Sequence, residues 1–169
     1  EFVGPRQFQF PDLQLRIVRD LLGALPERLR RDSFTHGLKT EYVRQPVEFW
    51  DAVDPTEAIR SDRILPEVDA LFETLVRVDY GGTILNLLLE NVIHNFEDDV
   101  ADGTVLRLLS RAERTLIEQG VLQNDFVVLA ARPRAEAGAG ETPCAGVTPT
   151  AAEGEEVACG VDRFRGADE

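Results

Sequence analysis

The chain has 169 residues, of which 43% are hydrophobic and 29% charged, so it can bury one hydrophobic core and is expected to form one domain. Its 31 acidic residues outnumber 18 basic ones, and the net charge of -13 repels phosphate backbones and anionic lipids. Nucleic-acid and membrane partners are therefore not expected. No segment approaches the roughly 20 apolar residues needed to span a bilayer, and the first residues lack a signal-peptide pattern, which predicts a cytoplasmic protein.

The C-terminal segment differs sharply in composition from the rest of the chain. Residues 135–169 contain no Leu or Ile, six of the 13 glycines, and eight acidic residues against two basic ones. Such a segment cannot bury enough apolar surface to offset the entropy lost on folding. We therefore predict a folded region at 1–134 and a disordered, acidic, Gly/Ala-rich tail at 135–169. Both cysteines, Cys144 and Cys159, lie in this tail and make neither a disulfide framework nor a zinc site.

The N-terminal part of the folded region predicts two helices and a connection. Apolar residues at helical spacing behind a proline predict a helix at 11–25. Residues 28–44 are highly charged without a sustained period, which predicts a surface connection. Pro46 starts a short turn, and the sequence Asp-Pro-Thr-Glu from Asp54 supplies the N-cap and first-turn residues of a second, short helix.

A helix and a strand follow. An apolar stripe predicts a helix at 64–72. The Ser-Asp pair at 61–62 can cap the start of this helix. Side chains then alternate over 73–80, which predicts a strand, and the Gly-Gly pair at 81–82 ends it.

The C-terminal part of the folded region predicts two more helices and a second strand. Residues 84–96 are apolar nearly all round, which predicts a helix packed on most of its sides. Residues 105–117 predict a helix with one apolar face, and Gly120 ends it in a left-handed conformation. The continuous apolar run 126–131 suits a strand buried on both faces. With 73–80 it makes only two clear strands, and two strands alone form a marginal sheet.

Several short motifs occur in an order and spacing that are typical of one enzyme family. They are Glu1-Phe2-Val3-Gly4-Pro5 followed by Phe8-Gln9, Asp54-Pro55-Thr56-Glu57-Ala58-Ile59-Arg60-Ser61, Asp79-Tyr80-Gly81-Gly82-Thr83, and His94-Asn95-Phe96. With the segments 113–120 and 125–133, they make residues 1–133 resemble the C-terminal part of a class I S-adenosylmethionine-dependent methyltransferase. Arg6 and Gln7 stand in the reverse of the order found in that family.

The resemblance implies an α/β fold: the C-terminal part of a Rossmann-like methyltransferase sheet, strands five to seven, with a large helical content. Residues 1–3 would end strand five, 74–80 would form strand six, and 126–131 the antiparallel strand seven between them. The glycine-rich loop and the acidic residue that hold S-adenosylmethionine in this family would lie upstream of Glu1. The chain has no Met, so we expect it to be a processed product or part of a longer polypeptide. The full-length member would bind the cofactor, and this chain alone would not.

The resemblance further implies that this chain supplies the substrate-side wall and lid over a small-molecule methyl acceptor, because ligands bind beyond the carboxyl ends of the strands in open α/β sheets. The candidate substrate-binding residues are Glu1, Arg6, Phe8, Gln9, Tyr80 and His94.

His94 is also the candidate general base, because the ordinary pKa of histidine suits proton removal from a hydroxyl or amine. A neutral histidine hydrogen-bonded to a glutamate or a carbonyl explains the same sequence. Glu90, four residues earlier, would share a helical face with it, but a metal site needs a third ligand, so we predict no metal.

Two other functions fit the sequence. The chain could be a non-catalytic fragment that keeps this half of the fold as a binding surface, or an unrelated helical protein-interaction module, so whether it is part of an active enzyme is open. An unpaired sheet edge beside residues 2–3 would favour self-association.

Overall fold

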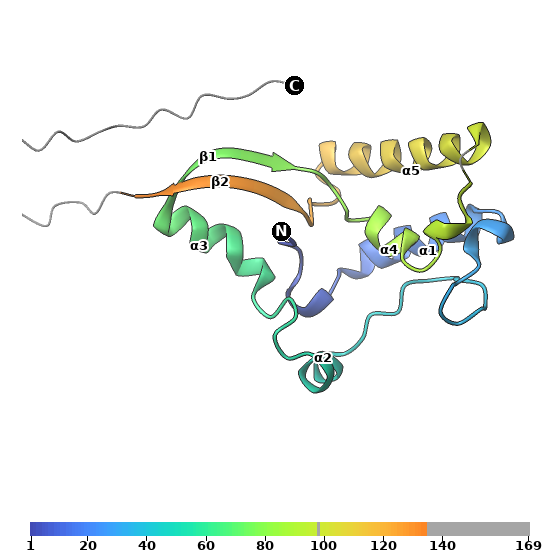
Figure 1. Cartoon of the computed structure of the whole chain (residues 1–169), viewed down its shortest axis with the longest axis horizontal. Coiled ribbons are helices and arrows are strands. Elements are labelled where there is room, and N and C mark those ends of the chain that lie inside the picture. The colour runs from blue at the N-terminus through green and yellow to red at the C-terminus, as the bar shows by residue number, and fades with distance from the viewer. Residues whose placement is uncertain (98, 135–169) are drawn as a thin grey trace, which may run out of the picture. The chain divides into compact units, whose positions relative to one another are not determined.

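The computed structural model describes residues 1–97 and 99–134. The tail predicted at 135–169, with both cysteines, lies outside the described residues. The helices and strands are α1 (Asp12–Ala24), α2 (Val47–Val53), α3 (Ile64–Leu71), β1 (Phe72–Asp79), α4 (Leu85–Leu89), α5 (Val100–Glu118) and β2 (Val127–Pro133) (Figure 1). The prediction of a mixed α/β protein is confirmed, with a two-stranded sheet in the part of the chain that the structure describes.

The two strands pair antiparallel, from Phe72 opposite Pro133 to Asp79 opposite Val127. The N-terminal residues lie on the other side of β2, where Phe2 forms an antiparallel bridge with Phe126. The amide of Val127 donates to the carbonyl of residue 1 (3.0 Å), while the carbonyl of Phe126 accepts from the amide of residue 80 on the β1 side (3.2 Å). The start of β2 therefore lies between residues 1–3 and the end of β1, and the predicted pairing of these three segments is confirmed.

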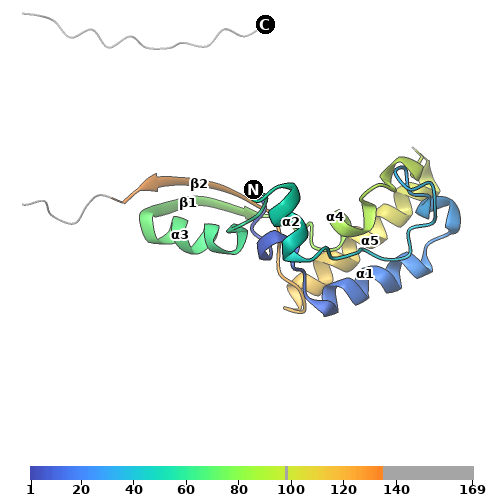
Figure 2. The same cartoon turned by 90° about the horizontal axis from the view of Figure 1, so that it is seen from below.

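The hydrophobic core lies among the helices at one end of the strands. Helix α1 packs against α4, and α4 packs against α5 (Figure 2). The core side chains that are almost fully excluded from solvent are Phe10, Val18, Leu22, Leu29, Ile84, Leu87, Leu88, Val92 and Val127. The predicted helices at 11–25 and 105–117 correspond to α1 and α5, and Gly120 has the predicted left-handed backbone, with a φ of 68°.

The short helix predicted from Asp54 is wrong. The helix lies earlier, at α2, where a turn was predicted, and Asp54 is the residue that ends it. The Asp54 carboxylate accepts from the amide and hydroxyl of Thr56 (3.1 and 2.8 Å), which forms a turn instead of a helix cap. Ala58 has a φ of 49°, which a helix cannot contain.

Helix α3 occurs where it was predicted, but without the predicted cap. The hydroxyl of Ser61 donates backward to the carbonyl of Ala58 (3.1 Å), and no side chain caps the first turn at Arg63. A short 3₁₀ turn at Ser61–Arg63 leads into the helix instead.

The continuous helix predicted at 84–96 is wrong. Helix α4 ends at Leu89, and a separate 3₁₀ turn covers Ile93–Asn95. The backbone leaves the helical conformation at Glu90, with a ψ of 127°, and at Asn91, with a φ of 59°. The ammonium of buried Lys39 donates to the carbonyls of Leu87 and Glu90 (2.7 Å each), and so satisfies carbonyls at the end of α4 that have no amide partner within the helix.

The surface connection predicted at 28–44 is also wrong in part. Leu29 is fully buried in the core, and Lys39 is only 8% exposed. Burial lowers the pKa of Lys39, and the carboxylate of Glu90, 3.5 Å away, opposes that shift.

Strand β2 is less buried than its sequence predicts. Val127 is buried and Leu129 is half-buried, but the other residues of the strand are exposed. The paired strands extend away from α1, α4 and α5, so these helices do not cover them (Figures 1 and 2).

Candidate functional site

A buried carboxylate organises the turn that leaves β1. Glu113 of α5 is 5% exposed. Its two oxygens accept from the amides of Gly82 (3.0 Å), Ile84 (2.6 Å) and Leu85 (2.9 Å). The amides of Ile84 and Leu85 lie at the start of α4, where they have no partner within the helix, and the amide of Gly82 lies in the turn before it. Glu113 satisfies all three and joins α5 to the end of the strand.

The Gly-Gly pair of this turn is required by its geometry. Gly81 and Gly82 have φ angles of 79° and 77°, in the left-handed region that favours glycine. A Cβ on Gly81 would lie 2.3 Å from the Glu113 carboxylate, and one on Gly82 would lie 2.3 Å from the Phe126 ring. The turn can therefore pack closely against both α5 and the start of β2.

A second buried carboxylate, Asp125, lies just before β2. It is 4% exposed, and its Oδ2 accepts from Nε2 of Gln14 (3.0 Å). The same Gln14 nitrogen donates to the carbonyl of Thr83 (2.7 Å), so α1, the Gly-Gly turn and β2 meet at this amide. Burial raises the pKa of Asp125 to about 6, against the lowering effect of the Gln14 and Thr83 side chains, and the charge of Glu113 adds to the rise.

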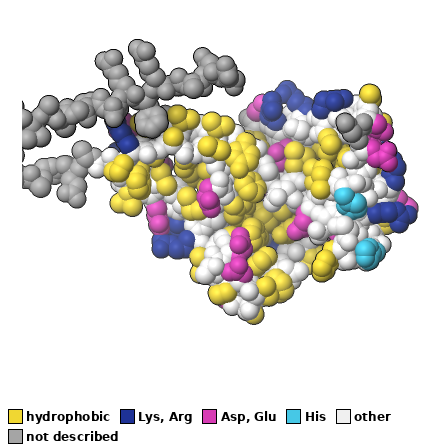
Figure 3. Space-filling model, viewed as in Figure 1, with side chains coloured by type: hydrophobic (Ala, Val, Ile, Leu, Met, Phe, Trp, Pro, Cys, Tyr) yellow, Lys and Arg dark blue, Asp and Glu magenta, His cyan; other side chains and the backbone are white. Residues whose placement is uncertain are grey.

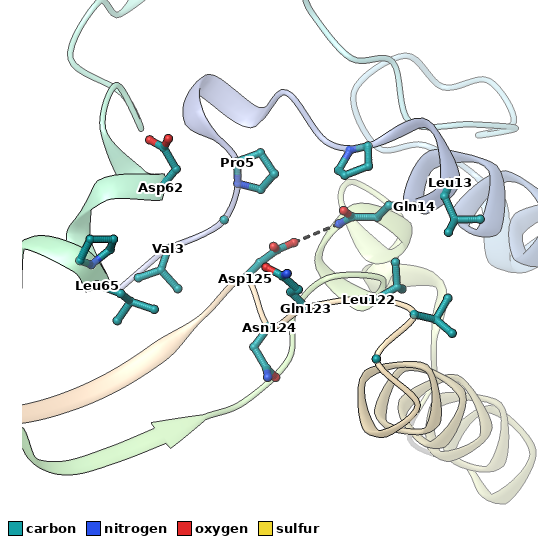
Figure 4. Close-up of a pocket in the computed structure, with 15 residues that line it drawn as sticks. Val3, Pro5, Leu13, Gln14, Asp62, Leu65, Leu122, Gln123, Asn124 and Asp125 are labelled. Carbon is teal, nitrogen blue, oxygen red and sulfur yellow. Dashed lines mark hydrogen bonds between the residues drawn. The ribbon is translucent and has the colours of Figure 1, made fainter. Parts of the chain in front are cut away.

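Asp125 and Gln14 line a pocket of about 480 Å³ (Figure 4). The N-terminal segment 3–5, the start of α1, the start of α3 and the loop 120–125 surround it. The lining residues are Val3, Gly4, Pro5, Pro11, Leu13, Gln14, Asp62, Leu65, Pro66, Gly120, Val121, Leu122, Gln123, Asn124 and Asp125. Elements that are far apart in the sequence therefore build one cavity with apolar walls and a few polar groups, which is typical of ligand sites.

The predicted substrate-binding residues of the N-terminal segment do not line this pocket. Arg6 is exposed, Phe8 packs in an aromatic cluster, and the Gln9 amide donates to two main-chain carbonyls. Gln7 is fully buried instead, and its amide donates to the carboxylate of Asp51 (2.9 Å). Of Arg6 and Gln7, the pair that stands in reversed order, Gln7 is therefore the buried residue.

The other predicted residues are spread over the surface. The main-chain nitrogen of Glu1 donates to the carbonyl of Val127 (2.8 Å), and the side chain of Glu1 is exposed. Tyr80 is 53% exposed and packs against Phe126, with ring centroids 5.7 Å apart. His94 is exposed on a 3₁₀ turn, so the prediction that it shares a helical face with Glu90 is wrong, because the helix ends before both residues.

Sequence reasoning missed Gln14, Glu113 and Asp125. Two of them carried a signal, because Gln14 and Glu113 occupy inward positions of amphipathic helices, four residues from Val18 and Leu109 respectively. A polar residue on an apolar stripe indicates a buried hydrogen bond. Asp125 carried no comparable signal.

No protein-family model matches this chain, and no similar curated protein or solved structure was found. Over residues 1–97 and 99–134, no helix is both long and apolar enough to cross a membrane. In the same part of the chain, no group of three or more His, Cys, Asp or Glu side chains is placed to hold a metal ion. The methyltransferase assignment, which rests on sequence motifs, thus stays a prediction.

We expect Asp125→Asn to stabilise the protein at neutral pH. The pKa of the native carboxyl, about 6, lies above its ordinary 3.8, so the charge that Asp125 gains costs wild-type stability as the pH rises from about 4 to about 6. Asparagine keeps an oxygen for Gln14 without that charge. In urea denaturation at pH 4 to 8, the free energy of unfolding of the variant minus that of the wild type should grow over this window to about 3 kcal/mol and then stay constant.

The exposed variant Asp20→Asn, whose side chain is 69% exposed, is the matched control and should show no such trend. An advantage of Asp125→Asn that shrinks as the pH rises would contradict the assignment of a raised pKa to this carboxyl.

Proposed function

We propose that this chain is part of a class I S-adenosylmethionine-dependent methyltransferase, in which it supplies the substrate-side wall and lid. The single observation that supports the proposal most is the pairing around the start of β2. Residues 1–3 lie on one side of it and β1 lies antiparallel on the other. This is the arrangement expected of the last three strands in the family that the motifs resemble.

In this proposal, the working end of the strands carries residues 1–9, the Gly-Gly turn and the pocket beside Asp125. Helices α4 and α5 follow the turn and form the lid. Methyl transfer from a sulfonium needs donor and acceptor held in line, and positioning does most of that work. The role of this chain is to orient a small-molecule acceptor, while residues outside it hold S-adenosylmethionine.

The proposal can be tested with the polypeptide that the complete reading frame encodes. We expect the reading frame to encode a strand, a glycine-rich turn and, about 20 residues later, an acidic residue, all upstream of Glu1. Calorimetric titration of that polypeptide with S-adenosylmethionine should show one-to-one binding. With a panel of small hydroxyl and amine acceptors, chromatography should detect release of S-adenosylhomocysteine.

The 169-residue chain is the control and should give no heat at micromolar cofactor. A one-to-one isotherm for this chain would contradict the placement of the cofactor site outside it. A complete polypeptide that binds no S-adenosylmethionine would contradict the proposed function itself.

The exposed strands favour a second candidate function, docking of another protein. Hydrophobic side chains gather over the strands in Figure 3. Five large hydrophobic side chains of β1, of the residue that follows β1, and of β2 are more than half exposed. They are Leu75, Val76, Val78, Tyr80 and Val128. Exposed apolar patches of this kind often mark interaction sites.

Light scattering and thermal melting of the 169-residue chain separate the two candidates. Part of an enzyme sheet should self-associate through the exposed strands or melt with low cooperativity. A monomeric chain with a cooperative transition would favour the independent interaction module.

A further inference from the structure

We propose that the pocket beside Asp125 is a binding site for a small organic amine, with the ammonium group against the Asp125 carboxylate and an apolar body between Val3, Leu13 and Leu65. The inference goes beyond the proposed function, since it concerns binding by this chain alone and needs no methyl donor.

The charge of the pocket selects a cation. Asp62 and Asp125 are the charged residues of its lining, which contains no Lys, Arg or His. They come from different elements, and Figure 4 shows them on different sides of the cavity. A phosphate or carboxylate ligand would meet two negative charges and no compensating cation, whereas an ammonium would be attracted by both.

The burial of Asp125 makes this attraction specific. The residue is 4% exposed, yet no basic side chain within the described residues forms an ion pair with it. Buried charges in proteins are usually paired, because an unpaired one loses its hydration without compensation. The side chains of Gln14 and Thr83 compensate only in part, which agrees with the raised pKa of the carboxyl. A bound ammonium would supply the missing partner.

The carboxylate is held in place before any ligand arrives. Gln14 is 3% exposed and donates both to Asp125 and to the carbonyl of Thr83, which fixes the orientation of the carboxylate from one side. On another side, a Cβ on Gly4 would lie 2.7 Å from Oδ1 of Asp125, so glycine lets the N-terminal segment approach the carboxylate. Such preorganisation lowers the cost of binding.

The size and walls of the pocket limit the rest of the ligand. A volume of about 480 Å³ lies within the range of small-molecule sites, and Val3, Leu13, Leu65 and Leu122 provide apolar surface. A ligand with one aromatic or branched aliphatic group next to its amine fits this combination. A bare metal ion fits it poorly, because no cluster of three or more ligating side chains exists in the described part of the chain.

Three matched probes test the inference on the 169-residue chain at pH 7.5. They are 2-phenylethylamine, 2-phenylethanol and phenylacetate, which share the ring and differ in charge. We expect chemical-shift changes at residues 122–125 and 13–14 on titration with the amine. We also expect binding of the alcohol and of the anion to be about tenfold weaker or more, as charge-assisted hydrogen bonds to a buried carboxylate require.

Two variants and one control complete the test. Asp125→Asn should weaken amine binding by about tenfold or more while leaving alcohol binding unchanged. Leu13→Trp, which narrows the pocket and leaves the carboxylate in place, should weaken binding of both. The control Asp20→Asn makes the same charge change at a side chain that is 69% exposed and outside the pocket, and should bind like the wild type. Equal binding of amine and alcohol, or wild-type amine binding by folded Asp125→Asn, would overturn the inference.

Discussion

Replacing Glu113 with alanine should destabilise the folded region by about 4 kcal/mol, since each buried amide left without an acceptor costs about 1–3 kcal/mol. The Glu113 carboxylate is the acceptor for three amides, those of Gly82, Ile84 and Leu85. Alanine cannot replace it, and water has little access to the buried amide of Ile84. Urea denaturation followed by circular dichroism measures the loss.

Two further variants show whether the hydrogen bonds cause this loss. Glu113→Gln keeps one oxygen and presents an NH₂ group to amides that are themselves donors, so about half of the loss should persist. Glu118→Ala, on the exposed side of the same helix, should change stability by less than about 0.5 kcal/mol. A Glu113→Ala variant within about 1 kcal/mol of the wild type would contradict a structural role for this carboxylate.

Replacing Gly82 with alanine should cost about 3 kcal/mol, because the backbone conformation and the available space both oppose a side chain. The φ angle is 77°, and the new Cβ would lie 2.3 Å from Cδ2 of the Phe126 ring. Relief would need movement of the Phe126 ring, which packs against the ring of Phe2 in the N-terminal segment, with centroids 5.5 Å apart. Thermal and urea denaturation of the variant test this expectation.

Two other glycines separate the causes of that loss. Gly120 has a φ of 68°, but a Cβ added there would have no neighbouring atom within 4 Å, so Gly120→Ala should show the backbone cost alone, about 1 kcal/mol. Gly23 lies in α1 with equally open space and no positive φ, so Gly23→Ala should stabilise by about 0.5–1 kcal/mol. If Gly82→Ala cost no more than Gly120→Ala, the close approach to Phe126 would be unimportant.

These two positions also bear on the candidate site. Glu113 and Gly82 hold the turn that carries the carbonyl of Thr83, and Gln14 bridges that carbonyl to Asp125. A loosened turn should therefore weaken amine binding as well as stability. Titration of Glu118→Ala with 2-phenylethylamine provides the control, since Glu118 is exposed and lies outside both the pocket and this chain of hydrogen bonds.

The helices predicted correctly from the sequence are those with a regular apolar stripe. Helices α1 and α5 each place apolar side chains on one face over three or more turns. This periodicity arises because one face of the helix must be buried whatever lies against it, so it needs no knowledge of the partner. The sequence of β1 also alternates, but every residue of this strand after Phe72 is exposed, so its alternation does not correspond to a buried face. The pairing of β2 with β1 and with residues 1–3 was predicted through the resemblance to a family, and not from the periodicity of these segments.

The break after α4, the buried carboxylates and the pocket depended on contacts between distant residues. Lys39, 48 residues before Leu87, donates to carbonyls at the end of α4 that have no amide partner within the helix. Buried Asp125 accepts a hydrogen bond from Gln14, 111 residues earlier, which meets it across the fold. The sequence alone determined the helices wherever burial of one face sufficed. Only the tertiary structure decided which polar groups were buried, because a polar side chain is buried when folding brings it a hydrogen-bond partner, and that partner lies far away in the chain.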